Sequence, residues 1–192
     1  MSFEVVLVAE DPLNNGYLLT DLVRRILREA GKPRAHVFVL PTPRTRGYAH
    51  AKRTLTEDVL PGFRENLLLF LPDRDGRDLT AELVGLETRA AAREVPVPLF
   101  CCAAVEEVET WLLAGHAEKL DDPWQVVRSD VSVKEHYFQP FLKRYATTRQ
   151  LGAGRKHLMA EALLNYDAIL ARCPELFDLQ NRIRQHLAEH PS

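Results

Sequence analysis

Acidic side chains stand directly after two apolar runs of this sequence. Glu10 ends the first run, and Asp73 and Asp75 follow the third run after a single proline. Carboxylate oxygens are the ligands that Mg²⁺ and Mn²⁺ prefer. Asp73 and Asp75 are two residues apart, so both can face one cation if the chain turns at Gly76. Glu10 could complete the coordination shell or act as a general acid or base.

A polar turn is the alternative interpretation of the same motif. An isolated Asp-x-Asp-Gly sequence is typical of a turn whose acids cap the next helix. The glutamate at position 10, which also ends an apolar run, supports the metal site instead. Both interpretations therefore stay open on the sequence alone.

Basic residues in two segments could contact a phosphate backbone. Arg44, Arg46, Lys52 and Arg53 lie in a predicted loop and the helix after it, and each could neutralise one phosphate. A solvated loop and helix surface explains them equally well. Arg155 follows a Gly-Ala-Gly sequence, where a helix start could present N–H groups to a phosphate. Ordinary helix initiation explains this motif too, and its spacing is not that of a Walker loop.

Alternating strands and helices must position these side chains. Short apolar runs rich in Val and Leu predict buried strands at residues 3–9, 36–40, 66–71 and 98–103. Helical spacing of apolar residues predicts helices at residues 17–30, 49–60, 78–94 and 104–115. This order indicates a three-layer α/β fold with a mostly parallel sheet and helices on both faces. Ligands of such sheets bind beyond the carboxyl ends of the strands, so we expect the acids at one rim.

The pattern changes after residue 115. An Asp-Asp-Pro sequence at 121–123 interrupts the chain, and helical spacing then returns. It predicts a long helix that ends at about residue 173 and another at 176–189. We therefore expect an α/β domain at residues 1–115 and a mainly helical extension at residues 116–192 that packs on it.

Composition excludes several classes of protein. The chain has 192 residues, 46% of them hydrophobic, and a net charge of −2, so it is not uniformly basic. No apolar run reaches the roughly 20 residues of a membrane span, and no signal peptide is recognisable. The odd count of 3 cysteines, without metal-site spacing, argues against a disulfide scaffold or a zinc module. We expect a reduced, cytoplasmic protein that does not bind membranes.

Charge is segregated along the chain in spite of the small net charge. Residues 24–64 carry ten basic and three acidic side chains. Residues 73–122 carry five basic and twelve acidic side chains, and residues 128–156 carry seven basic and two acidic ones. An acidic segment between basic segments suits an enzyme that binds metal ions and grips a polyanion around them. Solvated helix surfaces explain the segregation equally well.

Three segments resemble the Toprim (topoisomerase–primase) superfamily. They read VVLVAE at residues 5–10, LLLFLPDRD at 67–75 and AVEEVETWLLAG at 104–115. The last resembles the Glu-x-Trp-Leu-Leu-Ala signature of small stand-alone Toprim-like proteins, which are related to OLD-family nucleases and RloB-like defence proteins. The resemblance covers about the first 115 residues and implies a Toprim-like sheet.

The resemblance implies a Mg²⁺- or Mn²⁺-dependent nuclease or nuclease subunit. Glu10 would be the Toprim glutamate, Asp73 and Asp75 the metal-binding pair, and Glu109 a further acid near the metal. Lys156 would be the lysine that OLD-type enzymes place near the scissile phosphate. Nucleic acid, DNA in preference to RNA, would be the substrate. An ATPase partner in a bacterial defence locus is also implied, and a homo-oligomer stays open.

One departure from the family pattern supports an alternative. The family follows its first glutamate with glycine and a second acid, whereas Asp11 and Asn14 stand there in this chain. Asp11 could serve as a replacement ligand, or the metal site could be degenerate. Carboxylates of Glu10, Asp73 and Asp75 that converge and are open to solvent would favour an enzyme, and divergent or salt-bridged ones a module that binds a partner protein.

A response-regulator receiver domain also ends its first strand in paired acids, as VVLVAEDPLN does here. Its phosphoacceptor aspartate should lie about four residues before the loop proline. Leu68 occupies that position, and the later Lys-Pro signature is absent as well. A pseudo-receiver that binds a partner protein therefore remains as a fold analogue.

Overall fold

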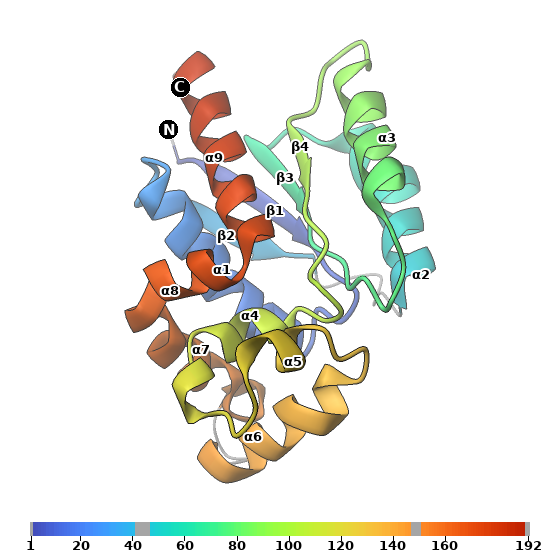
Figure 1. Cartoon of the computed structure of the whole chain (residues 1–192). Helices are drawn as coiled ribbons and strands as arrows, with labels where there is room; N and C mark the ends of the chain where they lie inside the picture. The colour runs from blue at the N-terminus through green and yellow to red at the C-terminus, as the bar shows by residue number, and fades with distance from the viewer. Residues whose placement is uncertain (1, 41–46, 147–150, 191–192) are drawn as a thin grey trace.

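A parallel β-sheet forms the centre of the protein. The computed structural model describes residues 2–40, 47–146 and 151–190. Within them the sheet has four strands, all parallel, in the order β2-β1-β3-β4 (Figure 1). Their bounds are β1 Glu4–Val8, β2 His36–Val39, β3 Leu67–Phe70 and β4 Leu99–Cys101. The predicted three-layer α/β fold is confirmed.

Both faces of the sheet are buried, which explains why its strands read as continuous apolar runs. Val5 and Leu7 of β1 face one core, and Val6 and Val8 face a second core on the opposite side. In Figure 1 one layer holds α1 and α9 and the other holds α2 and α3. These helices are α1 Asn15–Glu29, α2 Gly47–Arg53, α3 Thr80–Ala91 and α9 Pro174–Glu189. A π-helical turn and a 3₁₀ turn follow α2 at Thr54–Val59 and Leu60–Gly62.

Most helices between β4 and α9 gather at the end of the sheet where the strands finish (Figure 1). The α-helices of this part of the chain are α4 Glu109–Ala114, α5 Trp124–Arg128, α6 Gln139–Tyr145, α7 Arg155–Ala162 and α8 Tyr166–Arg172. Shorter turns lie at Ala117–Lys119, Lys134–Phe138, Leu151–Gly154 and Leu163–Asn165. Residues from both halves, such as Leu22 and Ile183, share one core. No helix among the described residues has the length and apolarity needed to cross a bilayer.

The long helix predicted to end near residue 173 is divided between α7 and α8. A 3₁₀ turn at Leu163–Asn165 separates them. The side-chain amide of Asn165 donates a hydrogen bond to the carbonyl oxygen of Gly115 at 3.1 Å. The break therefore lets the chain bond to the end of α4, an interaction that helical periodicity cannot report.

Strand β4 is one edge of the sheet, and side chains cover its backbone. The N–H of Cys101 donates to the carboxylate of Glu87 on α3. The carbonyl oxygen of Cys101 accepts from the guanidinium of Arg182 on α9 at 3.1 Å. Glu87 and Arg182 also pair with each other at 3.0 Å. The two helices are thus joined across this edge.

Close packing of α4 on α7 gives a first testable prediction. A Cβ atom on Gly115 would lie 2.5 Å from the Cβ and 2.7 Å from the Cα of Ala162. Gly115→Ala should therefore force the helices apart and lower the free energy of unfolding by about 2 kcal/mol. Urea denaturation measures this change. Gly85→Ala on α3 is the control, because nothing lies within 4 Å of its added Cβ, and equal loss in both variants would contradict the packing.

Candidate metal centre

The loop after β3 carries Asp73 into the interior. Asp73 forms an isolated parallel bridge with Ala104, which extends the pairing of β3 and β4 beyond both strands. One carboxylate oxygen of Asp73 accepts the backbone N–H of Val108 at 2.7 Å. The residue is only 8% exposed. The sequence thus places a buried acid at the carboxyl ends of two neighbouring strands.

Three carboxylates converge at this point. Oxygen atoms of Asp73, Glu107 and Glu109 all lie within 4.8 Å of one another. Glu109, at the start of α4, is fully buried, and Glu107 is partly exposed. Neither carboxylate oxygen of Glu109 has a hydrogen-bond partner among the residues that the structure describes. Oxygen ligands in this number and geometry can hold a divalent cation.

Lys134 supplies positive charge to the same cluster. Its ammonium lies 2.7 Å from a carboxylate oxygen of Glu107 and 3.2 Å from one of Glu109. Burial lowers the pKa of Lys134, but the charges of Glu109 and Glu107 outweigh burial and raise the pKa overall. Lys134 is therefore charged, and it neutralises part of the cluster.

Glu10 borders the cluster from the end of β1. One of its carboxylate oxygens accepts the backbone N–H of Asp73 at 3.0 Å. Burial raises the pKa of Glu10 to about 7, and the charges of Asp75 and Glu107 add to this effect. Burial, followed by the charges of Glu109, Glu10 and Glu107, also raises the pKa of Asp73 well above its ordinary value. Glu10 can therefore exchange a proton near neutral pH.

The raised pKa of Glu10 predicts a pH-dependent stability. From its ordinary pKa of 4.5 up to about 7, the unfolded chain ionises Glu10 while the folded chain keeps the proton. The metal-free protein should therefore lose stability across this range and stay less stable above it. Glu10→Gln keeps an oxygen for the Asp73 N–H, and it should exceed the unmodified chain by about 2 kcal/mol at alkaline pH, after allowance for solvent access.

Urea denaturation in EDTA, at several pH values across this range, measures the difference. The two chains should be equally stable below the ordinary pKa of a glutamate and diverge as the pH rises. Parallel stability profiles would contradict the prediction. An Asp21→Asn variant serves as the control, because Asp21 lies on α1 outside the acidic cluster.

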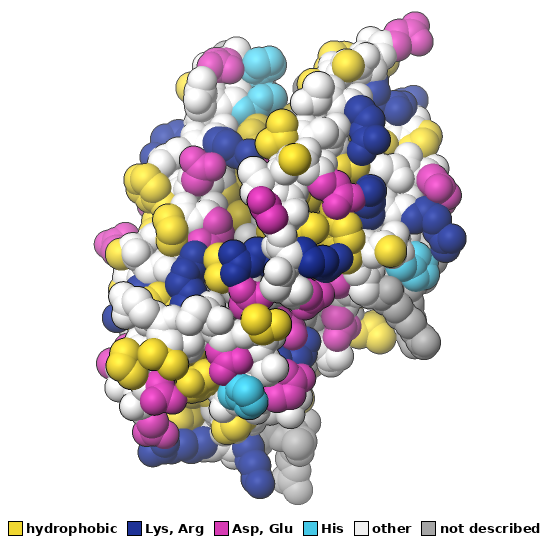
Figure 2. Space-filling view, turned by 45° about the vertical axis from the view of Figure 1, so that its right-hand side comes forward, with side chains coloured by type: hydrophobic (Ala, Val, Ile, Leu, Met, Phe, Trp, Pro, Cys, Tyr) yellow, Lys and Arg dark blue, Asp and Glu magenta, His cyan; other side chains and the backbone are white. Residues whose placement is uncertain are grey.

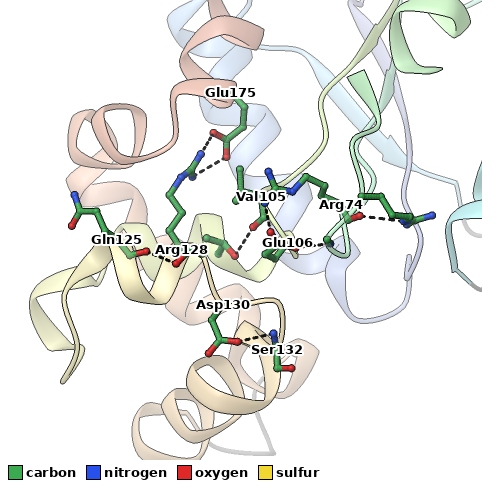
Figure 3. Close-up of polar contacts among 12 residues, drawn as sticks. Arg74, Val105, Glu106, Gln125, Arg128, Asp130, Ser132 and Glu175 are labelled. Atoms are coloured by element: carbon green, nitrogen blue, oxygen red, sulfur yellow. Dashed lines mark hydrogen bonds and ion pairs between the residues drawn. The ribbon is translucent and has the colours of Figure 1, made fainter. Parts of the chain in front are cut away.

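Glu106 fastens the loop that carries Asp73. Its carboxylate pairs with the guanidinium of Arg74 and accepts the N–H of Gly76 at 2.6 Å (Figure 3). Its carbonyl oxygen accepts the N–H groups of Arg74 and Asp75 at 2.9 and 3.1 Å. Glu106 and Asp75 have positive φ angles of 64° and 48°. Left-handed backbone at a non-glycine residue costs free energy and is often retained at functional sites.

The acids predicted from the sequence are only partly brought together. Glu10, Asp73 and Glu109 meet in or beside the cluster. The side chain of Asp75 is instead 51% exposed and pairs with Arg77 at 3.2 Å. Glu10, Asp73 and Asp75 therefore do not show the convergence open to solvent that we expect of an enzyme, because Asp75 is salt-bridged and Asp73 is buried.

The carboxylate of Asp11 binds Asn14 in the turn before α1. Its two carboxylate oxygens accept the side-chain and backbone N–H groups of Asn14 at 2.8 and 3.1 Å. Burial raises the pKa of Asp11, but hydrogen bonds from Asn14 and Leu13 and the charge of Lys134 lower it overall. Asp11 is thus ionised, and it does not belong to the three convergent carboxylates.

Sequence reasoning missed three residues of this site. Glu107 is a member of the cluster, Glu106 holds the loop, and Lys134 is the counter-ion. The first two had a usable signal, because the acidic run that contains them follows β4 as Asp73 follows β3. Lys134 lies in a later π-helical turn and had no such signal.

Those predicted basic contacts that the structure describes do not gather at the acids. Lys52 pairs with Glu82, and Arg53 is exposed on α2. Arg155 stacks over the ring of Phe138, with 5.1 Å between the guanidinium carbon and the ring centroid. Arg44 and Arg46 lie outside the described residues.

Lys156 lines a separate hollow. It is exposed at the start of α7 and borders a cavity of about 390 Å³ together with Tyr17 and Arg24 of α1. No acid of the cluster lines this cavity. The lysine that does contact the cluster is Lys134.

The surface around the site carries both signs of charge. Figure 2 shows acidic side chains directly below a row of Lys and Arg side chains in the middle of the face in view. The loop after β3 contributes exposed basic side chains, with Arg74 38% and Arg77 43% exposed.

No protein-family model, curated protein or solved structure matches the chain significantly.

Proposed function

We propose that this protein is a divalent-metal-dependent nuclease or nuclease subunit of the Toprim-like type. The observation that carries the proposal is the convergence of Asp73, Glu107 and Glu109 beyond the carboxyl ends of β3 and β4. Ligands of parallel α/β sheets bind in this place. Glu10, bonded to the backbone of Asp73, adds a proton-exchanging group.

The donor set fits Mg²⁺ or Mn²⁺. Glu109 offers two buried oxygens that lack hydrogen bonds among the described residues, one of them ion-paired with Lys134, and Asp73 and Glu107 offer further oxygens beside them. A bound ion of this class would polarise a phosphate oxygen as a Lewis acid and activate a water nucleophile. Asp73, Glu107 and Glu109 would hold the ion, and Glu10 would take up or deliver a proton.

Sequence features supply the choice of substrate and setting. The segments VVLVAE, LLLFLPDRD and AVEEVETWLLAG resemble Toprim proteins, which act on nucleic acid, and basic segments flank the acidic one. DNA is the first expected substrate, and an ATPase partner in bacterial defence fits the related small proteins. The free thiols of Cys101, Cys102 and Cys173 support a cytoplasmic setting.

Cleavage assays test the proposal. The purified protein is incubated with plasmid DNA and with single-stranded RNA in Mg²⁺, Mn²⁺ or EDTA. Cleavage should need the metal and should be lost in an Asp73→Asn/Glu109→Gln double variant. Asp75→Asn is the matched control, because Asp75 lies outside the cluster and asparagine tolerates its positive φ. Equal loss in both variants would contradict the assignment of the ligands.

A binding module is the second candidate function. The ammonium of Lys134 already sits against Glu107 and Glu109, and Asp75 is paired with Arg77. A degenerate Toprim-like protein or a pseudo-receiver that recruits a partner protein would carry such neutralised acids. Absence of both cleavage and metal binding by calorimetry would favour this candidate over the nuclease.

A further inference from the structure

We infer that Lys134 is an internal counter-ion of the acidic cluster, which a metal ion must displace in order to bind. The inference rests on the proposed metal centre, and it means that Lys134 controls the affinity of this centre for a metal ion. It concerns a residue that contacts the ligands, with the ammonium 2.7 Å from Glu107 and 3.2 Å from Glu109.

Lys134 and a metal ion compete for the same oxygen atoms. The ammonium contacts one oxygen of Glu107 and one of Glu109, and both residues belong to the convergent cluster. Mg²⁺ binds carboxylate oxygens at about 2.0–2.1 Å. A cation at that distance from these oxygens would lie against the ammonium, and two positive charges at such a separation repel strongly. The lysine must therefore withdraw when the ion enters.

Exposure determines which partner can move. Glu109 is fully buried at the first turn of α4, so its carboxylate has no route to solvent. The side chain of Lys134 is 28% exposed, which leaves its flexible stem a route outward. Lys134 is also the first residue of a π-helical turn, Lys134–Phe138, and such wide turns are frequent at functional sites.

Manganese binding by the Lys134→Met variant tests this inference. Methionine keeps the length of the stem and removes the charge. Calorimetry with Mn²⁺ alone should show affinity about tenfold higher than in the unmodified chain. The metal-free variant should melt at lower temperature, because the buried Glu109 and the partly exposed Glu107 lose their partner. Lys143→Met, which removes an exposed charge on α6, should leave the affinity unchanged.

A second measurement uses the unmodified chain. Acylation of Lys134 by an amine reagent, followed by mass spectrometry, should become faster when Mn²⁺ is added, because the ammonium leaves the cluster for solvent. Slower acylation with Mn²⁺, or equal or weaker binding of Mn²⁺ by Lys134→Met, would overturn the inference while the metal centre stands. Absence of Mn²⁺ binding in both chains would instead overturn the metal centre, and the inference with it.

Discussion

Asp73→Asn should abolish stabilisation of the protein by Mn²⁺ and should make the metal-free protein more stable. The asparagine oxygen still accepts the Val108 N–H that Asp73 accepts at 2.7 Å, so the loop keeps its conformation. Burial and the charges of Glu109, Glu10 and Glu107 raise the pKa of Asp73 well above its ordinary value. The unfolded chain therefore ionises Asp73 at a pH where the folded chain does not, which lowers stability at neutral pH.

Thermal unfolding with EDTA and with Mn²⁺ measures both effects. At a Mn²⁺ concentration 100 times the dissociation constant, the unmodified chain should gain about 2.7 kcal/mol, which raises Tm by about 5–10 °C in a chain of this size. Asp73→Asn should show no gain, and its Tm in EDTA should be the higher of the two. Asp75→Asn should keep the gain. A Mn²⁺-dependent rise in Asp73→Asn would show that the ion binds elsewhere.

Glu106→Ala should disable the site although Glu106 is not among the convergent carboxylates. The substitution leaves the N–H of Gly76 and the guanidinium of Arg74 without the carboxylate that each contacts. Removal of one partner from a buried ion pair costs up to about 5 kcal/mol. Since the side chain of Arg74 is 38% exposed, we expect about 2 kcal/mol, together with weaker metal binding as the loop of Asp73 loosens.

Urea denaturation and calorimetry with Mn²⁺ separate the two effects of Glu106. Glu106→Gln is the graded control, because its amide oxygen can still accept the Gly76 N–H while the charge opposite Arg74 is lost. Its loss of stability should lie between those of the unmodified chain and Glu106→Ala. An alanine variant with unchanged stability and unchanged metal affinity would show that the loop holds its conformation without Glu106.

Strand ends were the part of the site that the sequence could predict. Apolar runs identify β1 and β3, and the rule for parallel sheets then brings Glu10 beside Asp73, as their 3.0 Å hydrogen bond confirms. Glu107 was not predicted as a site residue, because residues 104–115 were predicted to form a helix. The chain instead continues as a bridge at Ala104 and turns through positive φ at Glu106 before α4 begins.

Long-range packing determines the site residues that the sequence could not predict. Lys134 is separated from Glu107 by 27 residues, and no local pattern links a lysine in a π-helical turn to an acid beyond a strand. Lys156 was chosen from the family resemblance, yet it lines a cavity beside Tyr17 and Arg24. Both lysines lie in the helical half of the chain. The position of these helices at the end of the sheet depends on close contacts such as that of Gly115 with Ala162.

The pair of Glu87 and Arg182 across β4 also bears on whether another strand can add to this edge of the sheet. An exposed strand edge is a template on which an unfolded segment or another sheet can add a strand, the first step of many aggregation reactions. Here charged side chains from α3 and α9 already occupy the N–H and carbonyl groups of Cys101. A strand that adds to β4 would have to displace the salt bridge of Glu87 and Arg182 before it could bond to the backbone of Cys101. The salt bridge therefore protects this edge against strand addition and fibril growth.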